Sequence, residues 1–158
     1  MAKTFTATIQ WERNGATFAD NRYSRVHEWT FDGGVVVPAS ASPSSVPPPF
    51  SSPNAVDPEE ALVAATSSCH MLWFLWLAAQ EGLIVESYKD HAHGILGSDE
   101  TGTIRFTRIA LRPQIQFQGT QPTPQQLQEL HHAAHKACYI ANTLQCPVIV
   151  EDAGELGA

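Results

Sequence analysis

The sequence is short of cysteine and of basic residues. Its 158 residues include three cysteines, which are too few and of the wrong parity for a disulfide scaffold. We therefore expect thiols that are buried, reactive or metal-binding. Nine Lys and Arg against sixteen Asp and Glu give a formal net charge of −7, which argues against nucleic acid and anionic membranes as partners.

Several motifs are also missing. The N-terminal residues have no apolar core typical of a secretory signal, so a cytoplasmic protein is expected. No internal repeat, glycine-rich phosphate loop or Gly-x-Ser-x-Gly elbow is present, and no cofactor is expected. The length favours a single domain over residues 1–158, or one subunit of an interlocked oligomer.

What the sequence does have is one long helix signal, from Asp57 to Gly82. Asp57 suits the N-cap, Pro58 suits the first helical position, and Glu60 completes a capping box. Gly82 can adopt the left-handed conformation that ends a helix.

Between these ends the predicted helix is apolar on every side from Ala61 to Ala79, so it must be buried in a core or in a membrane. The polar residues Thr66–His70 at mid-length, and the lack of a second apolar span or a basic flank, argue against the membrane. A chain of this size covers only part of such a helix, and the remainder would form a larger apolar patch than monomers tolerate. We therefore expect a homodimer in which two of these helices pair about a two-fold axis.

The rest of the chain predicts an α+β domain. Residues 37–57 are rich in proline and serine and are expected to form an ordered loop over a site, and residues 152–158 a tail. The second helix starts at a capping box, Thr123–Gln126, and is predicted to run to Asn142. The predicted strands are Thr4–Arg13, Tyr23–Phe31, Val35–Val37, Leu83–Leu96, Thr103–Phe117 and Cys146–Glu151, and the fourth and fifth form a hairpin.

Cys69 is the residue most suggestive of chemistry, because it lies in the polar patch of the long helix. Arg25 shares a strand face with Trp29 and Phe31 and points inward, unless the strand twists and leaves it in water. A guanidinium near a thiol favours the thiolate, and a carboxylate such as Glu59 could orient that guanidinium. Glu59 lies ten residues before Cys69, about 15 Å along a straight helix, so the helix bends or the groups meet across a dimer interface.

These residues carry a family resemblance. The run DPEEALVAATSSCHM, with a Pro-Glu pair ten residues before the cysteine, resembles the signature of the OsmC/Ohr family of thiol peroxidases. The segment AHKACYIANTL resembles that family's second-cysteine helix, and the agreement in element order extends over about residues 4–151. The resemblance implies that Cys69 is the peroxidatic cysteine, Cys138 the resolving cysteine, and Arg25 with Glu59 the activating pair.

The same resemblance implies an intertwined homodimer, with antiparallel sheets around two central long helices. It implies reduction of organic hydroperoxides through a Cys69 sulfenic acid and a Cys69–Cys138 disulfide, with a dithiol such as a lipoyl protein as reductant. Three features depart from the family pattern. Tyr139 stands where proline is frequent, Cys146 is an additional thiol, and Arg22 is an alternative to Arg25.

Two other functions remain open. His131, His135 and Cys138 fall on one face of the second helix and are ligand types that suit zinc, although solvent-exposed histidines are the simpler explanation. Alternatively, the fold is a non-catalytic dimeric binding module whose apolar pocket, lined by Trp73 and Trp76, holds a small hydrophobic ligand.

Overall fold

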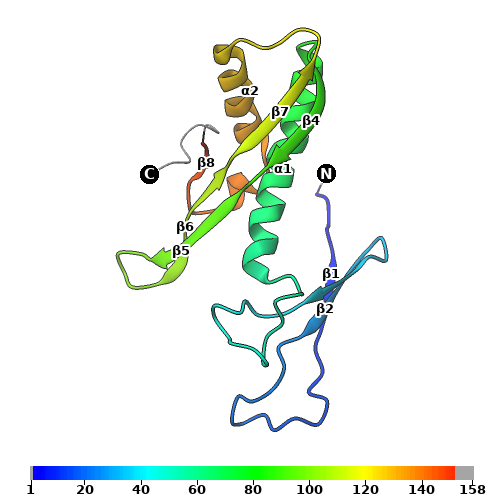
Figure 1. The fold of residues 1–158 in the computed structure, drawn as a ribbon, viewed down its shortest axis with the longest axis vertical. Helices are drawn as coiled ribbons and strands as arrows, with labels where there is room; N and C mark the ends of the chain where they lie inside the picture. The colour runs from blue at the N-terminus through cyan, green and yellow to red at the C-terminus, as the bar shows by residue number, and fades with distance from the viewer. Residues whose placement is uncertain (1, 152–158) are drawn as a thin grey trace. The chain divides into compact units, whose positions relative to one another are not determined.

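The computed structural model describes residues 2–151 and has eight strands and two α-helices within that range (Figure 1). The chain divides into two compact units, residues Met1–Ala61 and Leu62–Ala158. The expectation of one domain over residues 1–158 stays a prediction, and the predicted tail, residues 152–158, lies outside the described residues.

The N-terminal unit contains a three-stranded antiparallel sheet of β1 (Ala7–Gln10), β2 (His27–Phe31) and β3 (Val36–Ala39), with β2 in the centre. The first two strands are shorter than predicted because residues 11–25 form a loop around stacked aromatic rings. Phe18 and Tyr23 stack with ring centroids 4.7 Å apart, and Trp11 packs on both. Trp11 and Tyr23, which were predicted to lie in strands, pack against each other in this loop instead.

The proline- and serine-rich segment after β3 folds back on that strand. Val56 N–H donates to the Pro38 carbonyl, and Ser40 N–H donates to the Val56 carbonyl, each over 3.0 Å. Ser40 is fully buried, and its hydroxyl accepts a bond from Ser52 N–H at 3.0 Å. These bonds satisfy the backbone of a segment that has almost no regular secondary structure.

Helix α1 (Pro58–Gln80) has the ends that the sequence predicts. Asp57 Oδ1 accepts from Glu60 N–H at 2.7 Å, and Asp57 N–H donates to Glu60 Oε2 at 3.4 Å, which completes the capping box. Gly82 follows with a φ of 72°. One stripe of the helix, at intervals of four residues, is buried: Thr66, His70, Phe74 and Ala78.

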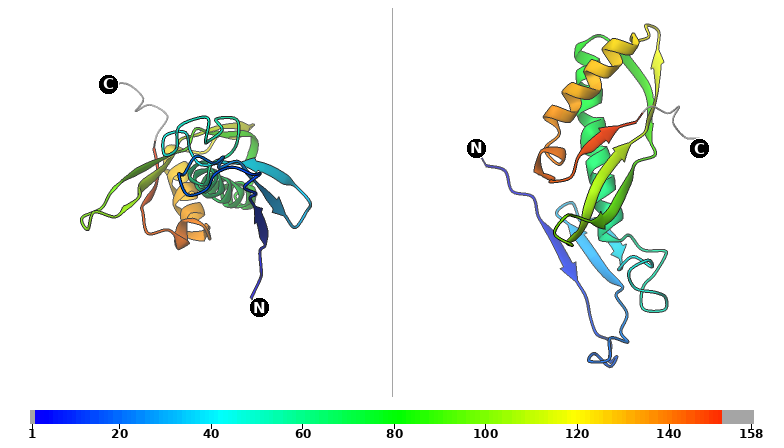
Figure 2. Two further views of the ribbon diagram at one scale, coloured as in Figure 1. Left: turned by 90° about the horizontal axis from the view of Figure 1, so that it is seen from below. Right: turned by 90° about the vertical axis from the view of Figure 1, so that its left-hand side faces the viewer.

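The second unit builds its core between α1, helix α2 (Pro124–Ala137) and a two-stranded sheet (Figure 2). Phe74 and Ala78 of α1 pack against Leu130 and Ala134 of α2. The surrounding partly buried side chains come from both helices, from β4 (Ile84–Asp90) and from β7 (Pro113–Gln118), which pair antiparallel.

A second sheet in this unit has the order β5 (His93–Ser98), β6 (Ile104–Leu111), β8 (Val148–Val150). β5 and β6 are antiparallel, and β8 joins β6 in parallel. The predicted hairpin is present, but each of its long arms breaks into two strands. At the break Pro113 has no N–H to donate, and the Arg112 N–H donates to the Asp90 side chain, at Oδ1, over 2.6 Å instead of to a backbone carbonyl.

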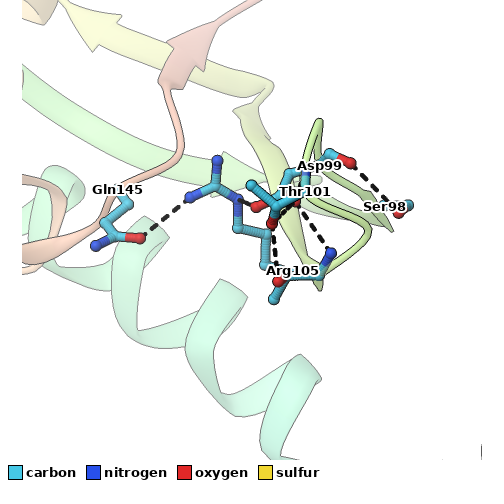
Figure 3. Close-up of polar contacts among 6 residues, drawn as sticks. Ser98, Asp99, Thr101, Arg105 and Gln145 are labelled. Carbon is cyan, nitrogen blue, oxygen red and sulfur yellow. Dashed lines mark hydrogen bonds and ion pairs between the residues drawn. The ribbon is translucent and has the colours of Figure 1, made fainter.

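The tip of the hairpin is organised by Asp99 (Figure 3). Its Oδ1 accepts from the backbone N–H groups of Thr101 and Thr103 and from the Thr101 hydroxyl. Arg105 Nε lies 3.1 Å from Asp99 Oδ2, and another nitrogen of the same guanidinium donates to Gln145. Hydrogen bonds to the carboxylate and the charge of Arg105 lower the pKa of Asp99. The hairpin tip is thereby linked to the segment that leads into β8.

Helix α2 ends earlier than predicted. Its capping box at Thr123 and Gln126 is present, but the helix stops at Ala137 rather than Asn142. Cys138 has extended dihedrals, φ −70° and ψ 109°, and a short 3₁₀ turn, Ala141–Thr143, follows. The Asn142 side chain donates to the Lys136 carbonyl at 2.9 Å, which satisfies one of the last carbonyls of the helix. The placement of Cys138 within the helix was therefore wrong, since it caps the helix end.

Candidate active site

The structure brings Cys69 and Cys138 together. Cys69 is half-buried in the middle of α1, and Cys138 is fully buried at the end of α2. Both are free thiols, and they lie close enough together to interact electrostatically. Burial and the interaction with Cys69 raise the pKa of the Cys138 thiol to about 11. The third cysteine, Cys146, is also free and half-buried.

The backbone after α2 holds Cys138 in place. The N–H of Ala141 donates to Cys138 Sγ at 3.4 Å. The Cys138 carbonyl accepts from Asn142 N–H at 3.0 Å. The early end of α2 therefore creates the turn that surrounds this thiol.

Aromatic rings lie beside the dithiol. Trp73, one helical turn after Cys69, makes edge-on contacts with Trp76 and with Tyr139, at centroid distances of 5.8 and 5.6 Å. Tyr139 directly follows Cys138 and is 69% exposed. Tyrosine at this position, where the family often has proline, thus packs the turn that holds Cys138 onto α1.

The polar patch of α1 has a structural explanation for three of its five residues. Thr66 Oγ1 donates to the Leu62 carbonyl at 2.8 Å. Ser67 Oγ donates to Asp90 Oδ2 at 2.5 Å, and Asp90 also receives the Arg112 N–H. His70 Nε2 lies 3.1 Å from His131 Nδ1. Cys69 is the member that interacts with another thiol.

The contact between the buried His70 and the partly buried His131 was not predicted from the sequence. His70 is 1% exposed, stacks on His131 with centroids 5.4 Å apart, and has no hydrogen-bond partner for Nδ1 among the described residues. Burial, followed by the nearby His131 and His135, lowers the pKa of His70 to about 4. The imidazole is therefore neutral at physiological pH and serves the helix–helix contact.

Arg25 lies in the loop before β2, not on the strand face that was predicted. Its Nη1 donates to the Asn21 and Tyr23 carbonyls at 2.7 and 2.5 Å, and its guanidinium lies 3.9 Å from the centre of the Tyr23 ring. Arg22, the alternative, is exposed. Glu59 is in the first turn of α1, and its buried Oε2 has no hydrogen-bond partner among residues 2–151. No ion pair joins Arg25 and Glu59 in this part of the chain.

A metal site was the other possibility for this region. Over residues 2–151, no group of three or more His, Cys, Asp and Glu side chains is arranged to hold a metal ion. His131 contacts His70 instead, and His132 is exposed. The zinc alternative therefore gains no support from the described residues.

Comparisons with known proteins identify the fold. A model of the OsmC-like protein family matches residues 51–151. A search of curated proteins returned no match. An OsmC-like protein of unknown function from Vibrio cholerae is 50% identical, with a TM-score of 0.93 over 96% of this chain and 99% of that chain.

More distant structures share the fold alone. Organic hydroperoxide resistance proteins from Elizabethkingia anophelis and Bacillus subtilis are each 16% identical, with TM-scores of 0.70 and 0.64. The matches cover 96% and 95% of this chain and 98% of each of those chains. Helix α1 is long and apolar enough to cross a membrane by length and composition, but in the matched fold it is the core helix. The predicted α+β class and the family resemblance are confirmed, and the chain belongs to the OsmC-like family.

Proposed function

We propose that this protein is a cytoplasmic, cysteine-based peroxidase that reduces organic hydroperoxides. The observation that carries the proposal is the interaction between the Cys69 and Cys138 thiols, the two residues to which the family resemblance assigns the reactive roles. Distant relatives with the same fold have names that refer to organic hydroperoxide resistance, which supports the substrate class.

The proposed cycle has two chemical steps. The Cys69 thiolate attacks the distal peroxide oxygen, the O–O bond breaks, and an alcohol leaves while Cys69 becomes a sulfenic acid. Cys138 then attacks the Cys69 sulfur, which forms the disulfide and releases water. The closeness of the two interacting thiols favours the second step, because a disulfide needs Cα atoms within about 7 Å. A dithiol, such as a lipoyl protein, returns both cysteines to the reduced state.

Arg25 and Glu59 are proposed to activate Cys69. The unpartnered Oε2 of Glu59 is buried, and a buried carboxylate oxygen favours a cationic partner. Arg25 uses Nη1 for two carbonyls of its own loop, and a guanidinium has further N–H donors on its other nitrogens. The bidentate arginine–carboxylate pair that the family resemblance implies therefore remains chemically available to both side chains.

We also propose that the active form is a homodimer. Leu72 is 60% exposed and Trp76 is 55% exposed, although both lie on a helix with few charged residues. The buried stripe of α1 uses only one side of the helix, and a second copy of the same helix would cover the other with the same surface on each subunit. This arrangement would also allow residues of one subunit to complete the site of its partner.

The deciding experiment is a thiol titration with an organic peroxide. One equivalent of cumene hydroperoxide should remove two free thiols from the wild type and form the Cys69–Cys138 disulfide. Cys69→Ser should lose turnover, and Cys138→Ser should allow one oxidation and then stop. An unchanged thiol count would refute the peroxidase and leave the binding module, with the Trp73 and Trp76 surface as its ligand site.

Substrate choice offers an independent measurement. Burial of an alkyl group against Trp73 would add binding energy that hydrogen peroxide does not provide, at about 25 cal/mol per Å² of apolar surface. Cumene hydroperoxide should therefore react faster than hydrogen peroxide. Equal rate constants would contradict this part of the proposal.

A further inference from the structure

The sheet β5–β6–β8 carries a group of basic side chains on one face. Arg108 lies on β6 and Arg112 directly after it, and their even spacing puts both on the same side as Ala110 between them. His93 on β5 pairs directly with Ala110, so it shares that face. Glu151, directly after β8, has its carboxylate beside both arginines. These four side chains, those of His93, Arg108, Arg112 and Glu151, are called the basic cluster below.

The two arginines of the basic cluster are bound unequally. Arg112 Nε donates to Glu151 Oε2 at 2.7 Å, which is a charge-assisted hydrogen bond. Arg108 Nη1 lies 3.8 Å from Glu151 Oε1, which is too far for a hydrogen bond. Arg108 Nε is shielded from solvent and has no hydrogen-bond partner among residues 2–151. Within that part of the chain, Arg108 therefore has a carboxylate nearby but makes no side-chain hydrogen bond to it.

The basic cluster has more positive charge and more donors than it uses internally. Two guanidinium groups and one carboxylate leave an excess of one positive charge, in a chain whose net charge is −7. His93 Nδ1 is also shielded from solvent and unpartnered among the described residues. A shielded donor without an acceptor costs free energy, and a guanidinium cannot lose its charge to avoid that cost.

Solvent reaches both guanidinium groups in spite of these shielded atoms. The side chain of Arg108 is 43% exposed and that of Arg112 is 25% exposed. Arg112 is held in place by Glu151, whereas Arg108 has no hydrogen bond to break before it turns its Nε edge towards a ligand. One arginine of the cluster is therefore fixed, and the other is free to close on an anion.

We propose that the basic cluster binds the carboxylate of a small organic acid. The proposal is independent of the two cysteines. A guanidinium presents a planar fork of N–H donors that matches the two oxygens of a carboxylate. A monocarboxylate cancels the single excess charge of the cluster, whereas a phosphate dianion would leave a negative charge beside Glu151. The charge balance thus favours a carboxylate over a phosphate.

The first test follows acetate binding to the full-length, reduced wild type by the NMR signals of the arginine Nε–H groups. Sodium acetate replaces sodium chloride at constant ionic strength and pH 7. The Arg108 signal should shift along a saturable curve. The Arg105 signal should not, because its Nε is already 3.1 Å from Asp99 Oδ2. No saturable shift at Arg108, or an equal shift at both arginines, would overturn the proposal.

The second test uses a matched pair of variants on the same strand. Arg108→Gln should weaken acetate binding about tenfold, the size of effect given by a hydrogen bond to a charged group. Arg105→Gln removes the same charge at a site already paired with Asp99, so it should bind acetate as the wild type does. Unchanged affinity in Arg108→Gln would overturn the proposal, and so would tighter binding of inorganic phosphate than of acetate to the wild type. The NMR titration needs no variant, so it decides the matter if Arg108→Gln does not fold.

Discussion

Acid should destabilise this protein through His70. The side chain is 1% exposed, and burial together with His131 and His135 lowers its pKa from 6.5 to about 4. In the unfolded chain the imidazole regains its ordinary pKa, so between these two values the unfolded state binds a proton that the folded state does not. Stability is therefore unaffected above pH 6.5 and is lost as the pH falls from 6.5 towards 4.

The magnitude follows from the same displacement. One pH unit corresponds to about 1.4 kcal/mol, so the full effect is roughly 3 kcal/mol below pH 4 and roughly 2 kcal/mol at pH 5. A loss of 2 kcal/mol is a large part of the 5–15 kcal/mol that holds typical domains folded. Carboxylates also titrate in this range: Glu151, for example, has its pKa lowered chiefly by Arg112. The effect of His70 must therefore be measured as a difference in unfolding free energy between the wild type and a variant that lacks this imidazole.

The assay is urea unfolding of the wild type and His70→Gln at pH 7 and pH 5, at one protein concentration. Glutamine keeps a donor near the position of Nε2 but does not titrate. The wild type should lose about 2 kcal/mol more than His70→Gln between the two pH values. His132→Gln, at an exposed position of α2, is the matched control and should behave as the wild type. Parallel losses in the wild type and His70→Gln would refute the reasoning.

Three further predictions concern packing, assembly and the redox pair. Gly94→Ala should cost about 1–3 kcal/mol in a denaturant titration, because its Cβ would lie 2.4 Å from Phe106 Cε1 and 2.8 Å from Val63 Cγ2. Gly97→Ala on the same strand meets only Thr107, at 3.1 Å, and should cost less; equal costs would contradict the packing. Trp76→Lys should dissociate the proposed homodimer in sedimentation, whereas Gln128→Lys should not, and a folded wild-type monomer of 17.2 kDa at micromolar concentration would exclude the dimer. Disulfide formation should change Trp73 fluorescence through the Tyr139 contact in the wild type but not in Cys138→Ser, and equal responses in the two proteins would contradict the coupling.

Local signals explain why both helix starts were predictable. Capping boxes at Asp57 and Thr123 depend on side chains within three residues of the cap, so the sequence alone specifies them. The same holds for the end of α1 at Gly82. The end of α2 depends on the turn around Cys138 and on the Asn142 side chain, and the apolar pattern of the helix gives no sign of it.

Strand ends were harder to predict because alternation also occurs outside sheets. Three aromatic rings form a cluster in the loop between β1 and β2: Trp11, Phe18 and Tyr23. They pack on each other, and Tyr23 also packs on Arg25, rather than on a neighbouring strand. Arg25 was placed on a strand face by the alternation with Trp29, but the cation–π contact with Tyr23 holds it in the loop. A period of two indicates strand geometry and does not show where hydrogen-bonded pairing stops.

The His70–His131 contact could not be predicted from periodicity because α1 is apolar on every side. In α2 the apolar residues form one stripe, which indicates that Leu130 and Ala134 face the core. In α1 no stripe stands out, so the sequence does not show which side meets α2 and which remains exposed. In the structure, the side of α1 with His70 and Phe74 packs against α2, and Trp76 on another side is left half exposed. Apolar side chains all around α1 therefore concealed the His70–His131 contact from sequence analysis. They are also the main reason to expect a second copy of the chain against this helix.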